Sequence, residues 1–211
     1  MEFLLNDLLI MQFAKWPVLG NVKTRLACSV GDEKALQVHM LLMQEVLSTL
    51  IAAKQQNIGD VELWVNKLPK SQGLMTSVMQ QLNKTSICCK RQKGHNLGDK
   101  MADAINTSLG AYKKVIIVGS DCPNISLHTL REASHALNDN DIVLGPAEDG
   151  GYVLIGASNF NPDIFIDVAW GEGKVLETTI KNINKLNLSY YALKESWDVD
   201  DLEDYKRWSN L

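Results

Sequence analysis

An aspartate stands at the end of a dense apolar run, in the stretch Val-Ile-Ile-Val-Gly-Ser-Asp-Cys-Pro at residues 115–123. An unbroken run of β-branched residues is typical of a parallel strand that is covered on both faces. Ligands of an open α/β sheet bind at the carboxyl ends of such strands. The pattern therefore predicts that Asp121 lies on a rigid support at a binding site, although an Asp in this setting also suits a plain turn.

A second acidic group lies far along the sequence, in the stretch Asp-Val-Asp-Asp at residues 198–201. Carboxylates from two distant segments can hold one Mg²⁺ ion, which also binds substrate phosphates. Acids also stabilise the N-terminus of a helix, and that role explains Asp201 well but Asp198 and Asp200 less well. We therefore expect a divalent metal site that includes Asp121, and both Mg²⁺ and Mn²⁺ accept such oxygen ligands.

The segment after the first expected strand combines three cations with a glycine, in Lys-Trp-Pro-Val-Leu-Gly-Asn-Val-Lys-Thr-Arg-Leu at residues 15–26. A glycine lets the backbone approach a ligand closely, and an arginine suits bidentate contact with phosphate oxygens. The segment matches neither G-x-x-x-x-G-K-[ST] nor G-x-G-x-x-G. Its place after the first strand favours a phosphate site, and a solvated surface loop is the alternative.

Two glycine-containing loops have both a structural and a functional interpretation. The stretch Glu-Asp-Gly-Gly-Tyr at residues 148–152 is typical of a hairpin turn. Asp149 could equally accept hydrogen bonds from sugar hydroxyls, while Gly150 and Gly151 let a ligand lie against the backbone. Trp170, in a Trp-Gly-Glu-Gly stretch, could form a lid over the site or fill the core.

Apolar periodicity predicts alternating strands and helices, which is the pattern of a mostly parallel sheet with helices on both faces. Strands are expected at residues 8–14, 61–66, 85–91, 114–120, 141–144, 152–155 and 189–193. Helices are expected at residues 32–54, 74–82, 96–109, 126–138, 173–186 and 201–208. No repeat or linker interrupts this pattern, so we expect a single α/β domain over residues 1–211 with a three-layer, Rossmann-like fold.

The composition argues against several classes of protein. The net charge of −4 over 211 residues argues against nucleic-acid binding, since such domains are usually strongly basic. The apolar start of the sequence has no positive leading segment and is too short for a membrane span. Cys28, Cys88, Cys89 and Cys122 form no metal-binding pair, which favours reduced thiols and a cytoplasmic location. A homodimer remains a candidate for the oligomeric state.

Together these motifs resemble one bacterial family. The matching stretches are F-A-K-x-P-x-x-G-x-V-K-T-R-L, G-S-D-C-P, L-G-P-A-x-D-G-G-Y-x-L-I-G, W-G and D-V-D, in this order over almost the whole chain. The family is described as glycosyltransferases associated with radical-SAM proteins, and it is assigned to the GT-A, nucleotide-diphospho-sugar transferase superfamily. The resemblance implies a GT-A fold, a nucleotide or nucleotide-sugar substrate, a small-molecule acceptor and a divalent cation.

The resemblance also implies roles for individual positions. The first-loop residues that would face nucleotide phosphates are Lys15, Gly20, Lys23, Thr24 and Arg25. Asp121 would be a catalytic metal ligand, and Asp200 would supply a second metal contact. Asp149, Gly150 and Gly151 would lie on the sugar or acceptor side. To these we add Trp170 as a candidate substrate contact and Asp149 as our candidate for the acceptor base.

The chain departs from the family pattern at three places. Leu19 replaces a usual proline, which loosens the first loop, and Asn96 replaces a usual aspartate, which removes a charge from a substrate contact. The pair Asp201-Leu202 replaces a common Thr-Pro at the start of the last expected helix. None of these changes removes a candidate metal ligand.

Three functions remain compatible with these residues. In glycosyl transfer from a nucleotide-diphospho-sugar, the metal at Asp121 would neutralise the leaving diphosphate, and Lys23 and Arg25 would add positive charge. In nucleotidyl transfer, a phosphorylated small molecule would attack the α-phosphate of a nucleoside triphosphate at the same metal. The third function is a nucleotide-binding module without catalytic activity.

Overall fold

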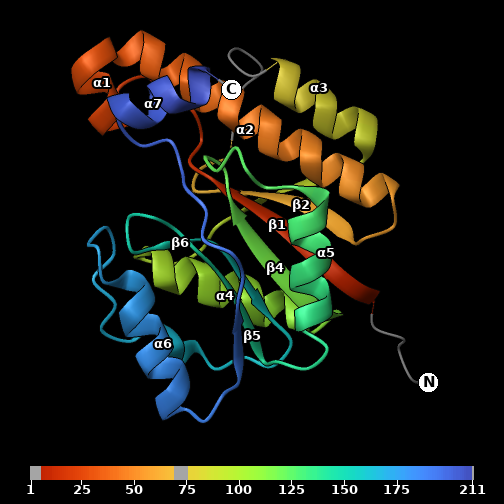
Figure 1. Ribbon diagram of the computed structural model, residues 1–211. Coiled ribbons are helices and arrows are strands. Elements are labelled where there is room, and N and C mark those ends of the chain that lie inside the picture. The colour runs from red at the N-terminus through yellow and green to blue at the C-terminus, as the bar shows by residue number, and fades with distance from the viewer. Residues whose placement is uncertain (1–5, 69–75, 211) are drawn as a thin grey trace.

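The computed structural model describes residues 6–68 and 76–210. Its centre is a sheet of seven strands in the order β3-β2-β1-β4-β6-β5-β7 (Figure 1). The strands are β1 (Asn6–Ala14), β2 (Asp60–Val65), β3 (Cys88–Arg91), β4 (Tyr112–Gly119), β5 (Ile142–Pro146), β6 (Tyr152–Ala157) and β7 (Tyr190–Ala192). Among these strands β6 alone runs antiparallel to its neighbours, β4 and β5. The predicted mostly parallel sheet is confirmed.

Helices cover both faces of this sheet, which confirms the three-layer arrangement (Figure 1). Helices α2 (Asp32–Gln55), α3 (Thr76–Thr85) and α5 (Leu127–Ala136) pack on one face. Helices α4 (Leu97–Leu109), η1 (Pro162–Phe165) and α6 (Val175–Lys185) pack on the other face. In β1, Leu8 and Ile10 face the first layer while Leu9 and Met11 face the second. Burial on both sides explains why the central strands are apolar at successive positions.

A smaller third core joins two helices that lie far apart in the sequence. Helix α1 (Thr24–Val30) packs against α7 (Leu202–Ser209) and the first half of α2, as Figure 1 shows for the orange and blue helices. Leu26, Trp197 and Val199 are buried in this core. The segment that carries Asp198 and Asp200 is therefore held against the first loop and the end of β4.

The structure corrects the expected elements around β3 and α1. The strand expected at residues 85–91 begins only at Cys88, because α3 continues to Thr85 and Ser86 reverses the chain at a φ of 52°. Helix α1 was not expected, since its seven residues are too few to establish a helical period. Of the helix expected at residues 74–82, positions 74 and 75 lie outside the described residues, and α3 is described from Thr76.

Helix α2 has the length and apolar composition of a membrane span, and among the described helices it alone meets that criterion. Its position in the fold is that of a core helix, because Leu47 and Leu50 are fully buried against the sheet. The amide of Gln12, on β1, also donates a hydrogen bond of 2.9 Å to the carbonyl of Met43 in α2. The apolar residues of α2 therefore belong to the core layer on this face of the sheet.

Candidate functional site

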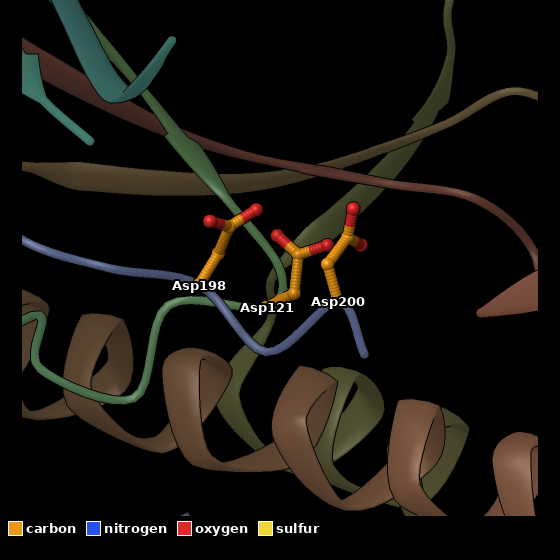
Figure 2. Close-up of side chains that lie close together, drawn as sticks. All are labelled: Asp121, Asp198 and Asp200. Carbon is orange, nitrogen blue, oxygen red and sulfur yellow. The ribbon is translucent and has the colours of Figure 1, made fainter. Parts of the chain in front are cut away.

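Three carboxylates gather at the carboxyl end of β4 (Figure 2). Asp121 follows the last residue of β4 by two positions, whereas Asp198 and Asp200 lie on the extended segment that precedes α7. One carboxylate oxygen from each residue lies within 4.8 Å of the others. The backbone N–H of Val199 donates a hydrogen bond of 3.0 Å to the carbonyl oxygen of Asp121, which fixes the two segments side by side.

Asp198 was missing from the predicted ligand set of Asp121 and Asp200, although the sequence contains a signal for it. Successive side chains of an extended segment point to opposite sides. Val199 is fully buried in the third core, so its two neighbours are directed to the other side, where Asp121 lies. The alternation Asp-Val-Asp therefore predicts that both acids share one side, provided the segment is read as extended.

The ammonium of Lys23 lies within this acidic group. Its Nζ donates hydrogen bonds to Asp121 Oδ2 at 2.7 Å and to Asp200 Oδ1 at 3.3 Å. The Lys23 side chain is only 3% exposed, while the Asp121 and Asp200 side chains are 31% and 41% exposed. Lys23 precedes α1 in a left-handed backbone conformation, with a φ of 47°. This turn directs a buried cation onto two candidate metal ligands.

Arg25 contacts the same group from its solvent side. Its Nη1 donates a hydrogen bond of 3.1 Å to Asp200 Oδ2, and its side chain is 65% exposed. An ion pair this exposed contributes little to stability because water and salt screen it. Lys23 and Arg25 therefore provide a buried and an exposed partner for the same carboxylate.

The pKa values within the group reflect burial and mutual charge. Burial raises the pKa of Asp121, but the adjacent ammonium of Lys23 outweighs this effect and holds the pKa below its usual value. Burial lowers the pKa of Lys23, but the carboxylates of Asp121 and Asp200 outweigh it, so the pKa is raised. Burial and then the charges of Asp121 and Asp200 raise the pKa of Asp198 to about 7. The cation thus keeps Asp121 ionised, while Asp198 takes up a proton most readily.

The donor set suits a hard divalent cation. Mg²⁺ and Mn²⁺ prefer carboxylate oxygens, and the three acids offer converging oxygens and no sulfur or nitrogen ligand. The group already attracts a positive charge in the form of Lys23. These residues therefore fit the cation that the sequence led us to expect.

A cavity of about 540 Å³ opens beside the acidic group. One part of its wall is charged and includes Lys15, Lys23 and Asp121. Another part is apolar and includes Phe13, Met101 and Trp170. Small-molecule sites of this size typically combine an apolar wall with a few polar groups.

The predicted first-loop residues divide between the cavity and the surface. Lys15 and Lys23 line the cavity. Gly20 is an exposed turn residue with a φ of 72°, and Thr24 is the exposed first residue of α1. Neither belongs to the cavity wall, and Arg25 reaches the site only through Asp200. The structure thus brings the two lysines to the cavity and leaves the other three residues around them.

His39 is a cavity residue that the sequence analysis did not single out. It lies on α2, is almost fully buried, and its Nε2 lies 2.9 Å from the carbonyl oxygen of Lys15. A carbonyl only accepts, so Nε2 carries the hydrogen. Burial lowers the pKa of His39, which favours the neutral ring. The only sequence signal was a polar residue on the apolar face of α2, and such residues are usually structural.

The Asp-Gly-Gly stretch forms the predicted hairpin turn between β5 and β6. Asp149 and Gly151 line the cavity, and Asp149 Oδ1 accepts a hydrogen bond of 2.8 Å from the backbone N–H of Gly151. Gly150 does not line the cavity. It has a φ of 83°, and a Cβ at this position would overlap the carbonyl of Gly173. Gly150 therefore lets the hairpin pack against the loop that carries Trp170.

Trp170 belongs both to the core and to the cavity wall. Its ring makes edge contacts with Tyr152 and Phe165, with ring centroids 6.4 and 5.8 Å apart. A Cβ on Gly98 would lie 2.8 Å from the Trp170 ring, so the start of α4 packs closely beneath it. Asn96, one of the departures from the family pattern, caps α4 by accepting a hydrogen bond of 2.9 Å from the Asp99 N–H.

The comparisons with known proteins agree with this architecture. A bacterial family described as "Uncharacterized protein conserved in bacteria (DUF2064)" matches residues 49–172. The 2-phospho-L-lactate guanylyltransferase of Methanocaldococcus vulcanius is 24% identical over 190 residues, which are 88% of this chain and 78% of that protein.

Solved structures share the fold. A protein of Desulfovibrio desulfuricans G20, described as a candidate nucleotide-diphospho-sugar transferase, is 29% identical with a TM-score of 0.79, over 95% of this chain and 85% of that one. A Methanothermobacter nucleotidyl transferase is 13% identical with a TM-score of 0.61, over 97% of each chain. The expected fold of nucleotide and nucleotide-sugar transferases is confirmed.

Proposed function

This chain belongs to the DUF2064 family of bacterial proteins, and we propose that it is a divalent-metal-dependent transferase that acts on a nucleotide-activated donor. The observation that carries the proposal is the meeting of Asp121, Asp198 and Asp200 around a buried lysine at the carboxyl edge of the sheet. Carboxylates that converge beside a cavity with basic residues are suited to a metal bound together with phosphates. The fold shared with nucleotide and nucleotide-sugar transferases supports this assignment.

Each part of the site has a role in such a reaction. Asp121, Asp198 and Asp200 would hold Mg²⁺ or Mn²⁺, which when bound supplies positive charge to the phosphates of the donor. Lys23 and Lys15 would contact the donor phosphates from the cavity wall, and Arg25 would add charge at its entrance. His39 would hold the first loop in place through the carbonyl of Lys15.

Glycosyl transfer from a nucleotide-diphospho-sugar is the first candidate reaction. The 29% identical protein of Desulfovibrio desulfuricans, described as a candidate transferase of this class, supports it. The aromatic wall around Trp170 offers an apolar surface to a sugar ring, and Gly151 lines the same cavity. Asp149 is our candidate for the acceptor base, through the carboxylate oxygen that does not accept from Gly151.

Nucleotidyl transfer is the second candidate reaction. The guanylyltransferase of Methanocaldococcus vulcanius, which aligns with 88% of this chain, supports it. The basic residues of the first loop also suit a triphosphate. In this reaction a phosphorylated acceptor would attack the α-phosphate, and it would need no base because its phosphate is already ionised.

The two reactions differ in their released product. We would incubate the full-length protein with Mg²⁺ or Mn²⁺ and panels of nucleoside triphosphates and nucleotide-diphospho-sugars, together with phosphorylated and unphosphorylated acceptors. Release of nucleoside diphosphate identifies glycosyl transfer, and release of pyrophosphate identifies nucleotidyl transfer. Metal-dependent nucleotide binding without turnover across both panels would instead support the non-catalytic module.

The proposal extends to the organisation and location of the protein. We propose a single domain over residues 1–211, a cytoplasmic location, a small-molecule acceptor and no role for nucleic acid. All four cysteines are free, in keeping with reduced thiols. A homodimer remains a candidate, and light scattering of the purified protein would decide between monomer and dimer.

A further inference from the structure

The ammonium of Lys23 lies between carboxylates that a bound metal ion would also contact. Its Nζ donates a hydrogen bond to one oxygen of Asp121 and one of Asp200. These are two of the three acids whose oxygens converge. Carboxylate oxygens bind Mg²⁺ at about 2.0–2.1 Å. A divalent ion on the same oxygens would therefore lie in close contact with the ammonium of Lys23, whose side chain is only 3% exposed.

This arrangement makes the metal and the lysine compete for the same carboxylates. The backbone of Lys23 is fixed, because its left-handed conformation begins α1 and α1 packs in the third core. Its side chain can still move, since four methylene groups carry the ammonium. The same side chain lines the cavity in which we place the donor phosphates. A phosphate is thus within the region that a displaced ammonium can reach.

We propose that Lys23 is a resident counter-cation that holds the three-aspartate centre in the metal-free protein and moves onto a donor phosphate when the metal binds. The inference rests on the proposed function, since it assumes a metal and a phosphate ligand at this site. Metal alone must displace a buried ammonium that has no new anionic partner. Metal and phosphate together provide that partner, so each ligand strengthens the binding of the other by the same factor.

Arg25 provides the contrast that isolates this role. It pairs with the same Asp200 and carries the same charge, but it is exposed, so solvent can replace its contact when a metal binds. Loss of Arg25 removes one exposed positive charge, while Lys23 still pairs with Asp121 and Asp200. Loss of Lys23 removes the buried cation that contacts both Asp121 and Asp200.

The first test measures Mn²⁺ binding to the full chain by electron paramagnetic resonance of the free ion. Wild type, Lys23→Met and Arg25→Met are each titrated alone and with inorganic pyrophosphate, a diphosphate common to both candidate donors. Chelation by free pyrophosphate is subtracted with a protein-free titration. In Lys23→Met we expect Mn²⁺ alone to bind at least about fivefold more tightly and the strengthening by pyrophosphate to shrink, whereas in Arg25→Met the affinity for Mn²⁺ alone should change by less than about twofold.

A second measurement needs no variant, because Lys23→Met leaves the partly buried Asp121 without its lysine partner and could fail to fold. Acetylation of lysines by an amine-reactive ester, read by mass spectrometry, reports whether the Lys23 ammonium is accessible. Lys23 should be protected in the metal-free wild type, become several-fold more reactive with Mn²⁺ alone, and be protected again with Mn²⁺ and pyrophosphate. The exposed Lys185, which does not line the cavity, serves as the reference lysine.

The outcomes separate this inference from the proposed function. If wild type binds Mn²⁺ but Lys23 labelling is unchanged and Lys23→Met behaves as Arg25→Met does, the exchange is refuted while the metal centre stands. If neither wild type nor Lys23→Met binds Mn²⁺, the metal centre itself is wrong, and the exchange is refuted with it.

Discussion

Asp121 is the residue on which the candidate site depends most, because it joins the rigid end of β4 to the late acidic segment. We expect Asp121→Asn to abolish the stabilisation of the protein by Mn²⁺ with a nucleotide donor. At a hundredfold excess over the dissociation constant, such stabilisation is about 2.7 kcal/mol in wild type. Thermal unfolding with and without ligands measures it. Asp139→Asn, at an exposed acid remote from the cavity wall, should retain the full shift.

Asp198 gives the metal-free protein a stability that depends on pH. Its pKa is raised to about 7 by burial and by neighbouring carboxylates, so the folded state binds a proton that the unfolded state releases near pH 4. The stability due to this group is therefore present below about pH 4 and declines as the pH rises through about 7. Asp198→Asn, which stays neutral, should gain on the order of 1 kcal/mol over wild type between pH 5 and pH 8, after allowance for partial exposure.

Urea unfolding in the presence of a chelator, at pH 5 and at pH 8, tests this expectation. The informative quantity is the difference between Asp198→Asn and wild type, because groups remote from Asp198 contribute equally to both proteins. An identical difference at the two pH values would mean that the pKa of Asp198 is not raised by burial and by the neighbouring carboxylates.

At the residue scale, the sequence indicated some roles better than others. Asp121 could be found because a fixed rule places ligands at the ends of parallel strands. The pairing of Lys23 with Asp121 and Asp200 could not be found, because these residues are 98 and 177 positions apart and no local pattern joins them. His39 could not be found either, since its function depends on a backbone carbonyl that any residue provides.

At the element scale, the hairpin between β5 and β6 is held against the Trp170 loop by a close backbone approach at Gly150. We expect Gly150→Ala to lower the free energy of unfolding by about 2–4 kcal/mol, from both the positive φ and the steric overlap. Gly171→Ala is the matched control, since Gly171 has a φ of 88° but open space around its Cβ position. Its cost should be about 1 kcal/mol.

Chemical denaturation of the two alanine variants measures this difference. Equal losses at Gly150 and Gly171 would show that the hairpin moves away from Gly173 without penalty. In that case the contact would not position Asp149 or Trp170.

The long elements could be predicted from the sequence and the short ones could not. Strands β1 and β4 and helices α2 and α4 carry enough apolar residues to establish their period. Helix α1 has seven residues and no side-chain cap, and it forms because α2 and α7 bury Leu26. Its stability thus comes from tertiary packing, which a local pattern does not contain.

At the scale of the whole molecule, α2 connects the sheet to the first loop, and its apolar character has a structural cause. We expect Leu47→Ala to lower the free energy of unfolding by about 2–5 kcal/mol, because Leu47 is fully buried. Leu41→Ala, on the same helix but 49% exposed, should change it by no more than about 0.5 kcal/mol. Urea unfolding of both variants checks this, and equal effects would argue against α2 as a core helix.

The order of the candidate ligands along the chain has a consequence for biosynthesis. All seven strands precede Asp198, and Asp121 lies between the fourth and the fifth. During translation the sheet can therefore pair completely before the last two carboxylates leave the ribosome. Because α1 packs against α7, the third core that places Lys23 forms only once this last helix is present, so the lysine and the three carboxylates come together in one late step of folding.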